Sequence, residues 1–170
     1  EVNENDLLEI VYTSGTTAEP KGVMLTHKNL LANITAVVKV VDITSDNTFL
    51  SVLPLTHLFE QNPGFLAPLS LGCTIVYIQG IRPNLIFKTL AEEKVTNIIL
   101  VPRLLKLFAD GIKREYEKKG LLTLFQFLLD IDAPPAIKKL LFLHVHKKFG
   151  THFQYFVSGG APLAPELDNL

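Results

Sequence analysis

The sequence has little of several residue types that would fix its class. Among 170 residues it has one cysteine, Cys73, and no tryptophan. One cysteine excludes an internal disulfide framework and a zinc site built from several cysteines, and it fits a reducing compartment. Neither sign of charge dominates, since 16 Lys and Arg face 17 Asp and Glu. We therefore expect no nucleic-acid partner and place the protein in the cytoplasm.

One uncharged stretch, residues 61–81, is long enough to span a membrane. It contains Pro63 and Pro68 and ends in the β-prone run 74–78, which favours a helix followed by a buried strand. The acidic residues 1–6 are unlike a signal peptide. We therefore expect no transmembrane segment, and at most a peripheral contact with a membrane surface.

Short apolar runs alternate with longer amphipathic segments along the chain, which is typical of an α/β layer with a largely parallel sheet flanked by helices. We expect strands at 7–12, 23–26, 49–53, 74–78, 97–101 and 153–157. We expect helices at 27–41, 59–71, 83–94, 102–120, 121–130 and 135–149. The length suits a single domain with a helical insertion over about 102–150. Because residue 170 falls in the first turns of a predicted helix, we expect the chain to be part of a longer protein.

The polar run Thr13–Gly22 follows the first strand and holds the strongest chemical signal. It contains four hydroxyl side chains, two glycines and Lys21. Hydroxyls and free backbone N–H groups donate to phosphate oxygens, glycine permits close approach, and lysine adds positive charge. The run lacks both the Walker A ending and the G-x-G-x-x-G fingerprint. It predicts a phosphate cradle, and a solvated Ser/Thr/Gly-rich loop is the alternative.

Two further segments follow strands, where α/β folds place their ligands. Leu53–Glu60 puts His57 in an apolar setting, which taken alone is more typical of a packed histidine than of a catalytic one. Ser158–Leu163 has two consecutive glycines, Gly159 and Gly160, at a strand end. They predict either a tight turn or a flat backbone surface for a planar ring.

Together, and in this order, Thr13–Gly22, Leu53–Glu60 and Ser158–Leu163 resemble the adenylate-forming (AMP-binding) superfamily of acyl-CoA synthetases, firefly luciferase and peptide-synthetase adenylation domains. The first segment is similar to the family's phosphate motif, except that Ala18 stands where glycine is usual. The other two segments, and the helical stretch after Pro102, look most like bacterial long-chain fatty acyl-CoA synthetases. The resemblance implies one partial AMP-binding domain, 1–170, from the large N-terminal domain of such an enzyme.

The resemblance implies a two-step reaction that uses ATP, Mg²⁺ and coenzyme A. A fatty acid carboxylate attacks the α-phosphate of ATP, giving acyl-adenylate and pyrophosphate, and the thiol of coenzyme A then displaces AMP. The family's Mg²⁺-binding glutamate, its ribose-binding aspartate and its C-terminal domain with the catalytic lysine have no counterpart in these residues. We therefore expect the isolated chain to be inactive.

The resemblance also assigns roles to individual residues. The implied ligands of the departing phosphates are Thr13, Ser14, Gly15, Thr16, Thr17 and Lys21. Thr13 would in addition contact Mg²⁺. His57 would stand beside the α-phosphate at the mouth of the acyl tunnel, with Leu58 next to it. The implied lining of the adenine pocket is Gly159, Gly160 and Ala161.

Other interpretations of the sequence stay open. One alternative is a non-enzymatic, regulatory module that binds a nucleotide with the same cradle. The feature that would distinguish such a module is the loss of a phosphate ligand. A lipid-binding protein without ATP chemistry leaves Thr13–Gly22 unexplained. A family member that activates another carboxylic acid also fits. The oligomeric state is open.

Overall fold

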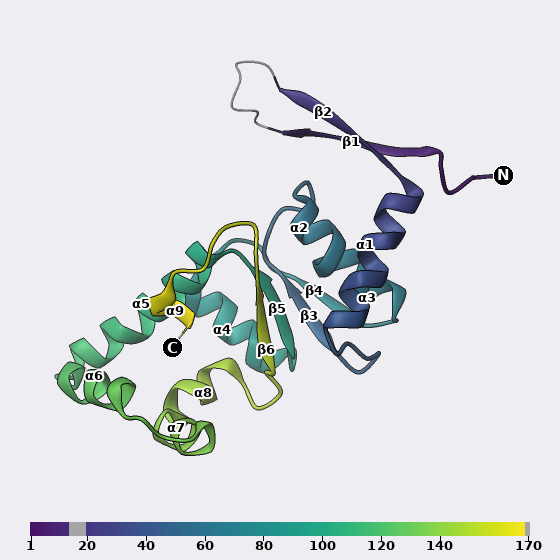
Figure 1. Ribbon diagram of the computed structural model, residues 1–170. Helices are drawn as coiled ribbons and strands as arrows, with labels where there is room; N and C mark the ends of the chain where they lie inside the picture. The colour runs from purple at the N-terminus through teal and green to yellow at the C-terminus, as the bar shows by residue number, and fades with distance from the viewer. Residues whose placement is uncertain (14–19, 169–170) are drawn as a thin grey trace. The chain divides into compact units, whose positions relative to one another are not determined.

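The computed structural model describes residues 1–13 and 20–168, and the chain forms two compact units, Glu1–Ile43 and Thr44–Leu170 (Figure 1). The elements of the first unit are β1 (Leu7–Thr13), β2 (Lys21–Thr26) and α1 (His27–Val40). The two strands form an antiparallel hairpin. The sequence predicted these three elements, but not that the strands would pair with each other apart from the parallel sheet.

Helix α1 begins directly after β2 because Thr26 caps it. The Thr26 hydroxyl accepts a hydrogen bond from the Asn29 backbone N–H at 3.3 Å, and the Asn29 side chain accepts one from the Thr26 N–H at 3.0 Å. This reciprocal capping box satisfies two backbone donors that a helix start otherwise leaves free. The hairpin and the helix are therefore joined without an intervening loop.

The second unit is built on a parallel sheet of four strands in the order β4-β3-β5-β6. The strands are β3 (Thr48–Ser51), β4 (Thr74–Tyr77), β5 (Asn97–Leu100) and β6 (Tyr155–Ser158). The helices are α2 (Leu58–Glu60), the π-helix η1 (Gln61–Leu66), α3 (Ala67–Ser70), α4 (Pro83–Glu92), α5 (Pro102–Lys118), α6 (Leu122–Asp130), α7 (Pro135–Leu141), α8 (Leu143–Phe149) and α9 (Pro165–Asp168). The predicted α/β class with a parallel sheet is confirmed.

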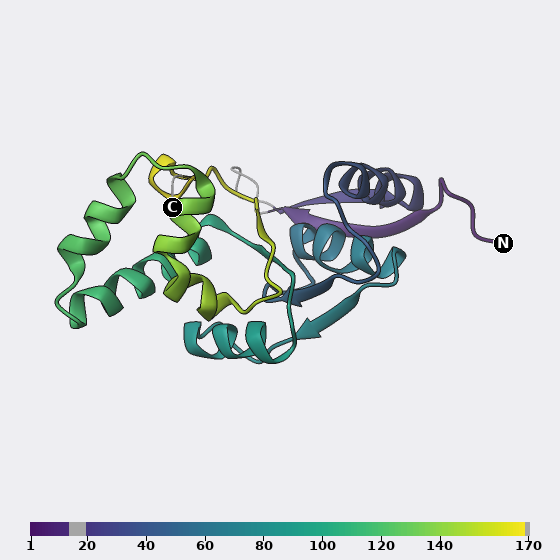
Figure 2. The same ribbon diagram turned by 90° about the horizontal axis from the view of Figure 1, so that it is seen from below.

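Helices cover both faces of this sheet, and Figure 2 shows α4 on the side opposite α2 and α3. Because side chains alternate along a strand, Leu50 and Ile98 share one face while Phe49 and Asn97 share the other. The first face packs on α4 and on α5, and α5 contributes Phe108 to this contact. Leu50, Ile98 and Phe108 are all buried. The second face lies under η1, which contacts β3 and β5.

A cluster of phenylalanines joins α4, α5 and α8 to the last strand. The rings in contact are those of Phe87, Phe108, Phe149, Phe153 and Phe156, with centroid separations between 4.7 and 6.2 Å. Fully burying one such side chain contributes about 1.5–3 kcal/mol. This cluster therefore fixes β6, and with it the start of the glycine pair that follows.

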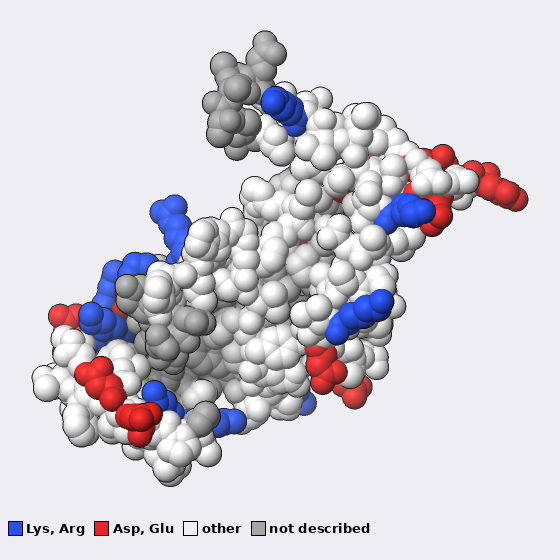
Figure 3. Space-filling model, viewed as in Figure 1, with Lys and Arg blue, Asp and Glu red and all other residues white. Residues whose placement is uncertain are grey.

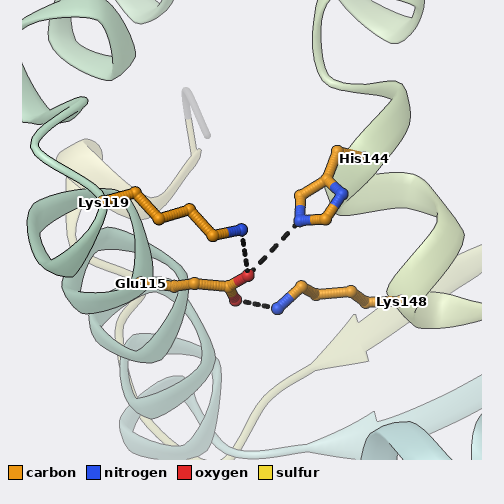
Figure 4. Close-up of polar contacts among 4 residues, drawn as sticks. All are labelled: Glu115, Lys119, His144 and Lys148. Carbon is orange, nitrogen blue, oxygen red and sulfur yellow. Dashed lines mark hydrogen bonds and ion pairs between the residues drawn. The ribbon is translucent and has the colours of Figure 1, made fainter.

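One carboxylate, that of Glu115, links helix α5 to helix α8. Glu115 on α5 accepts from Lys119 at 2.9 Å and contacts His144 of α8 at 3.3 Å, and its second oxygen pairs with Lys148 (Figure 4). Burial lowers the pKa of Lys148. Phe125 of α6 packs nearby between two aromatic rings, Tyr116 and Phe142.

Two predicted helices are divided in the structure. The helix predicted over 59–71 is split into α2, η1 and α3, because Pro63 and Pro68 lack the N–H groups that a continuous α-helix requires. The helix predicted over 135–149 breaks at Phe142, whose ψ of 21° departs from helical geometry. The Phe142 ring packs edge-on against Phe125, which places this break at a buried contact.

Among the described residues, every helix is too short or too polar to cross a bilayer. The uncharged stretch 61–81 is shared between η1, α3 and β4. On the face shown in Figure 3, Lys and Arg side chains gather where α5 lies. That helix carries five of them: Arg103, Lys106, Lys113, Arg114 and Lys118.

Candidate active site

The hairpin of the first unit holds the two ends of the predicted phosphate loop. Thr13 and Lys21 are opposite each other in the ladder, and the Thr13 hydroxyl donates to the Lys21 carbonyl at 3.4 Å. Both side chains are exposed. Gly22, the next residue of β2, packs so closely that an added Cβ would lie 2.9 Å from the Ile10 side chain.

The central residues of the predicted cradle, Ser14, Gly15, Thr16 and Thr17, lie outside the described residues, as does Ala18. Their predicted contacts with phosphate therefore stay predictions. What the structure adds is that the two flanking members of the motif, a hydroxyl and an ammonium, start from paired positions at the end of a strand ladder.

In the second unit, the segments that follow β3, β5 and β6 leave the sheet at one edge. The three strands are parallel, so their carboxyl ends coincide. Open α/β sheets bind their ligands outside this edge. The two predicted site segments of this unit, Leu53–Glu60 and Ser158–Leu163, start here.

His57 lies at the end of a tight turn after β3. Its backbone N–H donates to the Pro54 carbonyl at 3.0 Å, and its own carbonyl accepts from the N–H groups of Glu60 and Gln61, both at 2.9 Å. The imidazole is exposed and forms no hydrogen bond or ion pair with another described residue. A histidine whose role was packing would be buried. Leu58, predicted beside it, is half-buried.

The structure brings the histidine segment and the glycine segment together through Phe59. A Cβ added at Gly159 would lie 2.5 Å from two carbons of the Phe59 ring, so only glycine fits there without displacing the ring. Gly159 also donates its N–H to the Leu100 carbonyl at 3.3 Å, which continues the β5–β6 ladder. Gly160 follows with a φ of +78°, a conformation that favours glycine.

The backbone that follows Gly159 reaches the surface. Gly160 and Ala161 are both exposed. A flat, unobstructed stretch of backbone is suited to a planar ligand. Phe59, which sequence analysis gave no role, is the side chain that connects the two segments.

A pocket of about 470 Å³ opens at the same sheet edge. Its lining is mainly apolar and includes three charged side chains. The lining residues are Leu53, Ile81, Val101, Arg103, Leu104, Lys106, Leu107 and Asp110. This volume lies within the range of about 300–1,000 Å³ that is usual for small-molecule sites.

A comparison of the whole chain with known families bears on the predicted resemblance. The family model described as "AMP-binding enzyme" matches residues 1–169. The chain belongs to the AMP-binding enzyme family. The predicted resemblance to the adenylate-forming superfamily is thereby confirmed.

Curated relatives in this family are long-chain acyl-CoA synthetases. The chain is 34% identical to the peroxisomal long chain acyl-CoA synthetase 6 of Arabidopsis thaliana, over 96% of this chain and 24% of that protein. It is 35% identical to long-chain-fatty-acid–CoA ligase 5 of Mus musculus, over 94% of this chain and 25% of that protein. The chain thus spans about a quarter of the length of these relatives.

A solved structure shares the fold of this chain. The crystal structure of ATP-bound MatB from Rhodopseudomonas palustris has a TM-score of 0.68 to this chain at 24% sequence identity. The match covers 97% of this chain and 26% of the MatB chain. The arrangement of strands and helices is therefore the one found in that protein.

The AMP-binding chain also has a buried acidic residue that sequence analysis missed. Glu60 follows Phe59 and is fully buried. Burial raises the pKa of its carboxyl, while the nearby Ser51 hydroxyl and Leu53 backbone act in the opposite direction. The signal available in the sequence was one acid inside an otherwise uncharged run that extends from Leu58 to residue 81.

In the part of the chain that the structure describes, no three His, Cys, Asp or Glu side chains gather to form a metal site. The Thr13 hydroxyl, with its free lone pairs, is an oxygen ligand of the kind Mg²⁺ prefers.

Proposed function

We propose that the protein containing this chain is an acid–thiol ligase that activates a fatty acid with ATP and transfers it to coenzyme A. The observation that carries the proposal is the packing of Phe59 against Gly159. This contact joins the segment that carries His57, whose imidazole is exposed, to the glycine segment at the carboxyl ends of parallel strands. Together with membership of the family, the geometry supports the binding of adenine and a reacting phosphate at this edge.

In this proposal the chain's residues act mainly by position and charge, since the first step brings a carboxylate to a polyanion. His57 donates a hydrogen bond to the α-phosphate region, and Leu58 lies at the start of the acyl path. Gly159, Gly160 and Ala161 accommodate the adenine ring. The isolated chain, which carries only part of this machinery, is inactive.

The loop of the first unit would hold the phosphates that leave as pyrophosphate. Its ligands would be Thr13, Ser14, Gly15, Thr16, Thr17 and Lys21. Thr13 would add one oxygen to Mg²⁺ carried by the triphosphate, and the ion supplies charge neutralisation when bound. Lys21, exposed at the start of β2, is free to reach a phosphate oxygen.

We further propose a long-chain fatty acid as the substrate and coenzyme A as the acceptor. The names of the relatives in Arabidopsis and mouse support this choice. The apolar pocket at the sheet edge is the feature of this chain that fits an alkyl group. We place the protein in the cytoplasm, with any membrane contact limited to its surface.

The test is ATP–pyrophosphate exchange by the full-length protein with a series of acids. We expect exchange with palmitate to exceed exchange with malonate or benzoate. His57→Ala should lower the rate by about 10²–10³-fold, the loss typical of removing one donor to developing negative charge. The melting temperature should change little because the side chain is exposed.

His152→Ala is the matched control. His152 is also exposed, but it precedes β6 and lies toward the opposite edge of the sheet. Exchange at the wild-type rate in the His57 variant would contradict its role. A preference for a short or aromatic acid would keep the ligase and replace the fatty acid by another substrate.

A further inference from the structure

Glu60 is an anomaly in the core of the second unit. Its side chain is 0% exposed, and neither carboxylate oxygen has a hydrogen-bond partner with good geometry among the described residues. None of the ion pairs in the described ranges involves it. Buried polar groups in native proteins are nearly always satisfied, so an unsatisfied carboxyl requires an explanation.

The carboxyl lies against the backbone of the π-helix η1. A Cβ added at Gly64 would be 2.8 Å from Glu60 Oε1, so Gly64 leaves just enough room for it. On the other side are the Ser51 hydroxyl, at the end of β3, and the backbone of Leu53. The Glu60 side chain thus fills the space between the end of a central strand and the first turn of η1. Single π-helical turns are found frequently at functional sites.

The same residue closes the turn that presents the site. The Glu60 and Gln61 N–H groups both donate to the His57 carbonyl at 2.9 Å. Phe59, between them, packs on Gly159. The Glu60 backbone therefore belongs to the same turn as the imidazole and the ring.

The surroundings of Glu60 are free of other charge. In 51–66, which includes the end of β3 and all of η1, the one other titratable side chain is His57, which is exposed. β5, which also contacts η1, contains no titratable residue. A carboxyl without a cationic partner is accommodated best when protonated, and burial raises its pKa in this direction.

We propose that Glu60 is a positioning residue, whose buried carboxyl wedges the turn after β3 into the geometry that sets Phe59 against Gly159 and presents His57. This inference rests on the proposed adenylation function. It predicts that the site needs a neutral polar side chain of this size at position 60. It also explains why a carboxyl is tolerated in the core without an ion pair.

The experiment measures ATP–pyrophosphate exchange by the full-length protein with Glu60→Gln and Glu60→Ala. Glu60→Gln keeps the shape in a neutral form, so exchange should stay near the wild-type rate. Glu60→Ala should lower kcat by about tenfold to hundredfold, as expected when a catalytic group is misplaced by about 1 Å. The loss in kcat should exceed any rise in KM for ATP, because the loop that holds the phosphates is untouched.

Ile86→Val is the control for lost packing. Ile86 is also 0% exposed but lies on the opposite face of the sheet, in α4. It should lower the melting temperature without lowering kcat. If Glu60→Ala does not fold, the pH dependence decides: the wild-type rate relative to Glu60→Gln should fall as the pH rises, because only the wild-type side chain ionises.

Any of three results would overturn the inference. One is a Glu60→Ala enzyme with the kcat and KM of the Ile86→Val control. The second is a Glu60→Gln enzyme as impaired as Glu60→Ala. The third is a rate ratio that does not change with pH. A wild-type protein without any exchange would instead refute the proposed function, so the two failures are distinguishable.

Discussion

The phosphate loop of the first unit is characterised mainly by its sequence. The glycine edge of the second unit, Gly159 and Gly160, is characterised mainly by its structure. The loop Thr13–Gly22 has the more specific sequence motif, yet the structure describes it only as far as Thr13 and again from residue 20. The sequence of the glycine edge was ambiguous, because it predicted either a tight turn or a surface for a planar ring. There the structure supplies the decisive fact, the contact between Phe59 and Gly159.

The difference follows from what each region depends on. A phosphate loop works through hydroxyls and backbone N–H groups that are adjacent in sequence, so its residue types alone point to the chemistry. The glycine edge depends on two segments that are about a hundred residues apart in the chain and meet only in the folded sheet. Their relation is tertiary and has no local pattern.

Of the effects that bear on this comparison between the loop and the glycine edge, the largest concerns the loop. Lys21 is the one cation in Thr13–Gly22, so Lys21→Ala in the full-length protein removes a charge-assisted contact worth about 1.5–3 kcal/mol. Pyrophosphate exchange should fall roughly tenfold to hundredfold. Because the side chain is exposed, the melting temperature should stay constant.

Lys39→Ala provides the comparison for Lys21→Ala. Lys39 is exposed in the last turn of α1, in the same unit, and its removal changes the net charge equally. If both variants lose the same activity, the effect is one of overall charge, and the loop loses its assigned role.

The next effect concerns the glycine edge. Gly159→Ala places a Cβ 2.5 Å from the Phe59 ring, and overpacking of this kind costs about 1–3 kcal/mol. We expect a lower urea midpoint together with slower adenylation, since the ring that moves is next to His57. Gly111→Ala is the matched variant, because an added Cβ there meets nothing within 4 Å. Equal unfolding midpoints for the two variants would remove the argument for the Phe59–Gly159 contact.

The smallest effect is a dependence of stability on pH. Burial raises the native pKa of Glu60 above its usual value of 4.5, so the native state binds more protons than the unfolded state between these two values. Relative to Glu60→Gln, the wild-type protein should be most stable below pH 4.5 and lose stability as the pH rises through the raised pKa. Urea unfolding of both proteins from pH 4 to pH 8 measures this dependence. Parallel plots of unfolding free energy against pH would contradict the raised pKa.

Much of the fold could be read from the sequence because its signals are local. The strands at 49–53, 74–78 and 97–101 were evident as short apolar runs between polar segments, and the structure confirms a strand within each. The antiparallel pairing of β1 with β2 was not evident, because a polar run of ten residues gives no turn signal that fixes a hairpin. Pro63 and Pro68 were used only to argue against a membrane span, and the division of the predicted helix 59–71 with its π-helical part was not foreseen.

The site was predictable in part for the same reason. His57 and the glycine pair stood out by residue type and by their position after strands. Phe59 and Glu60 did not, since an aromatic residue and an acid next to a helix start are unremarkable in a sequence. Their importance comes from burial and from a contact with Gly159, which only the folded chain defines.

The ion pairs of Glu115 bear on which part of the second unit unfolds locally first. It ties α5 to α8 through His144 and Lys148, on a partly exposed surface, while the sheet is held by fully buried apolar side chains. Regions with few buried contacts open at lower free energy than the core. Amide hydrogens of α6 and α7 should therefore exchange with solvent as one group, earlier than those of β3 and β5, so the helical stretch behaves as a separately melting part of the unit.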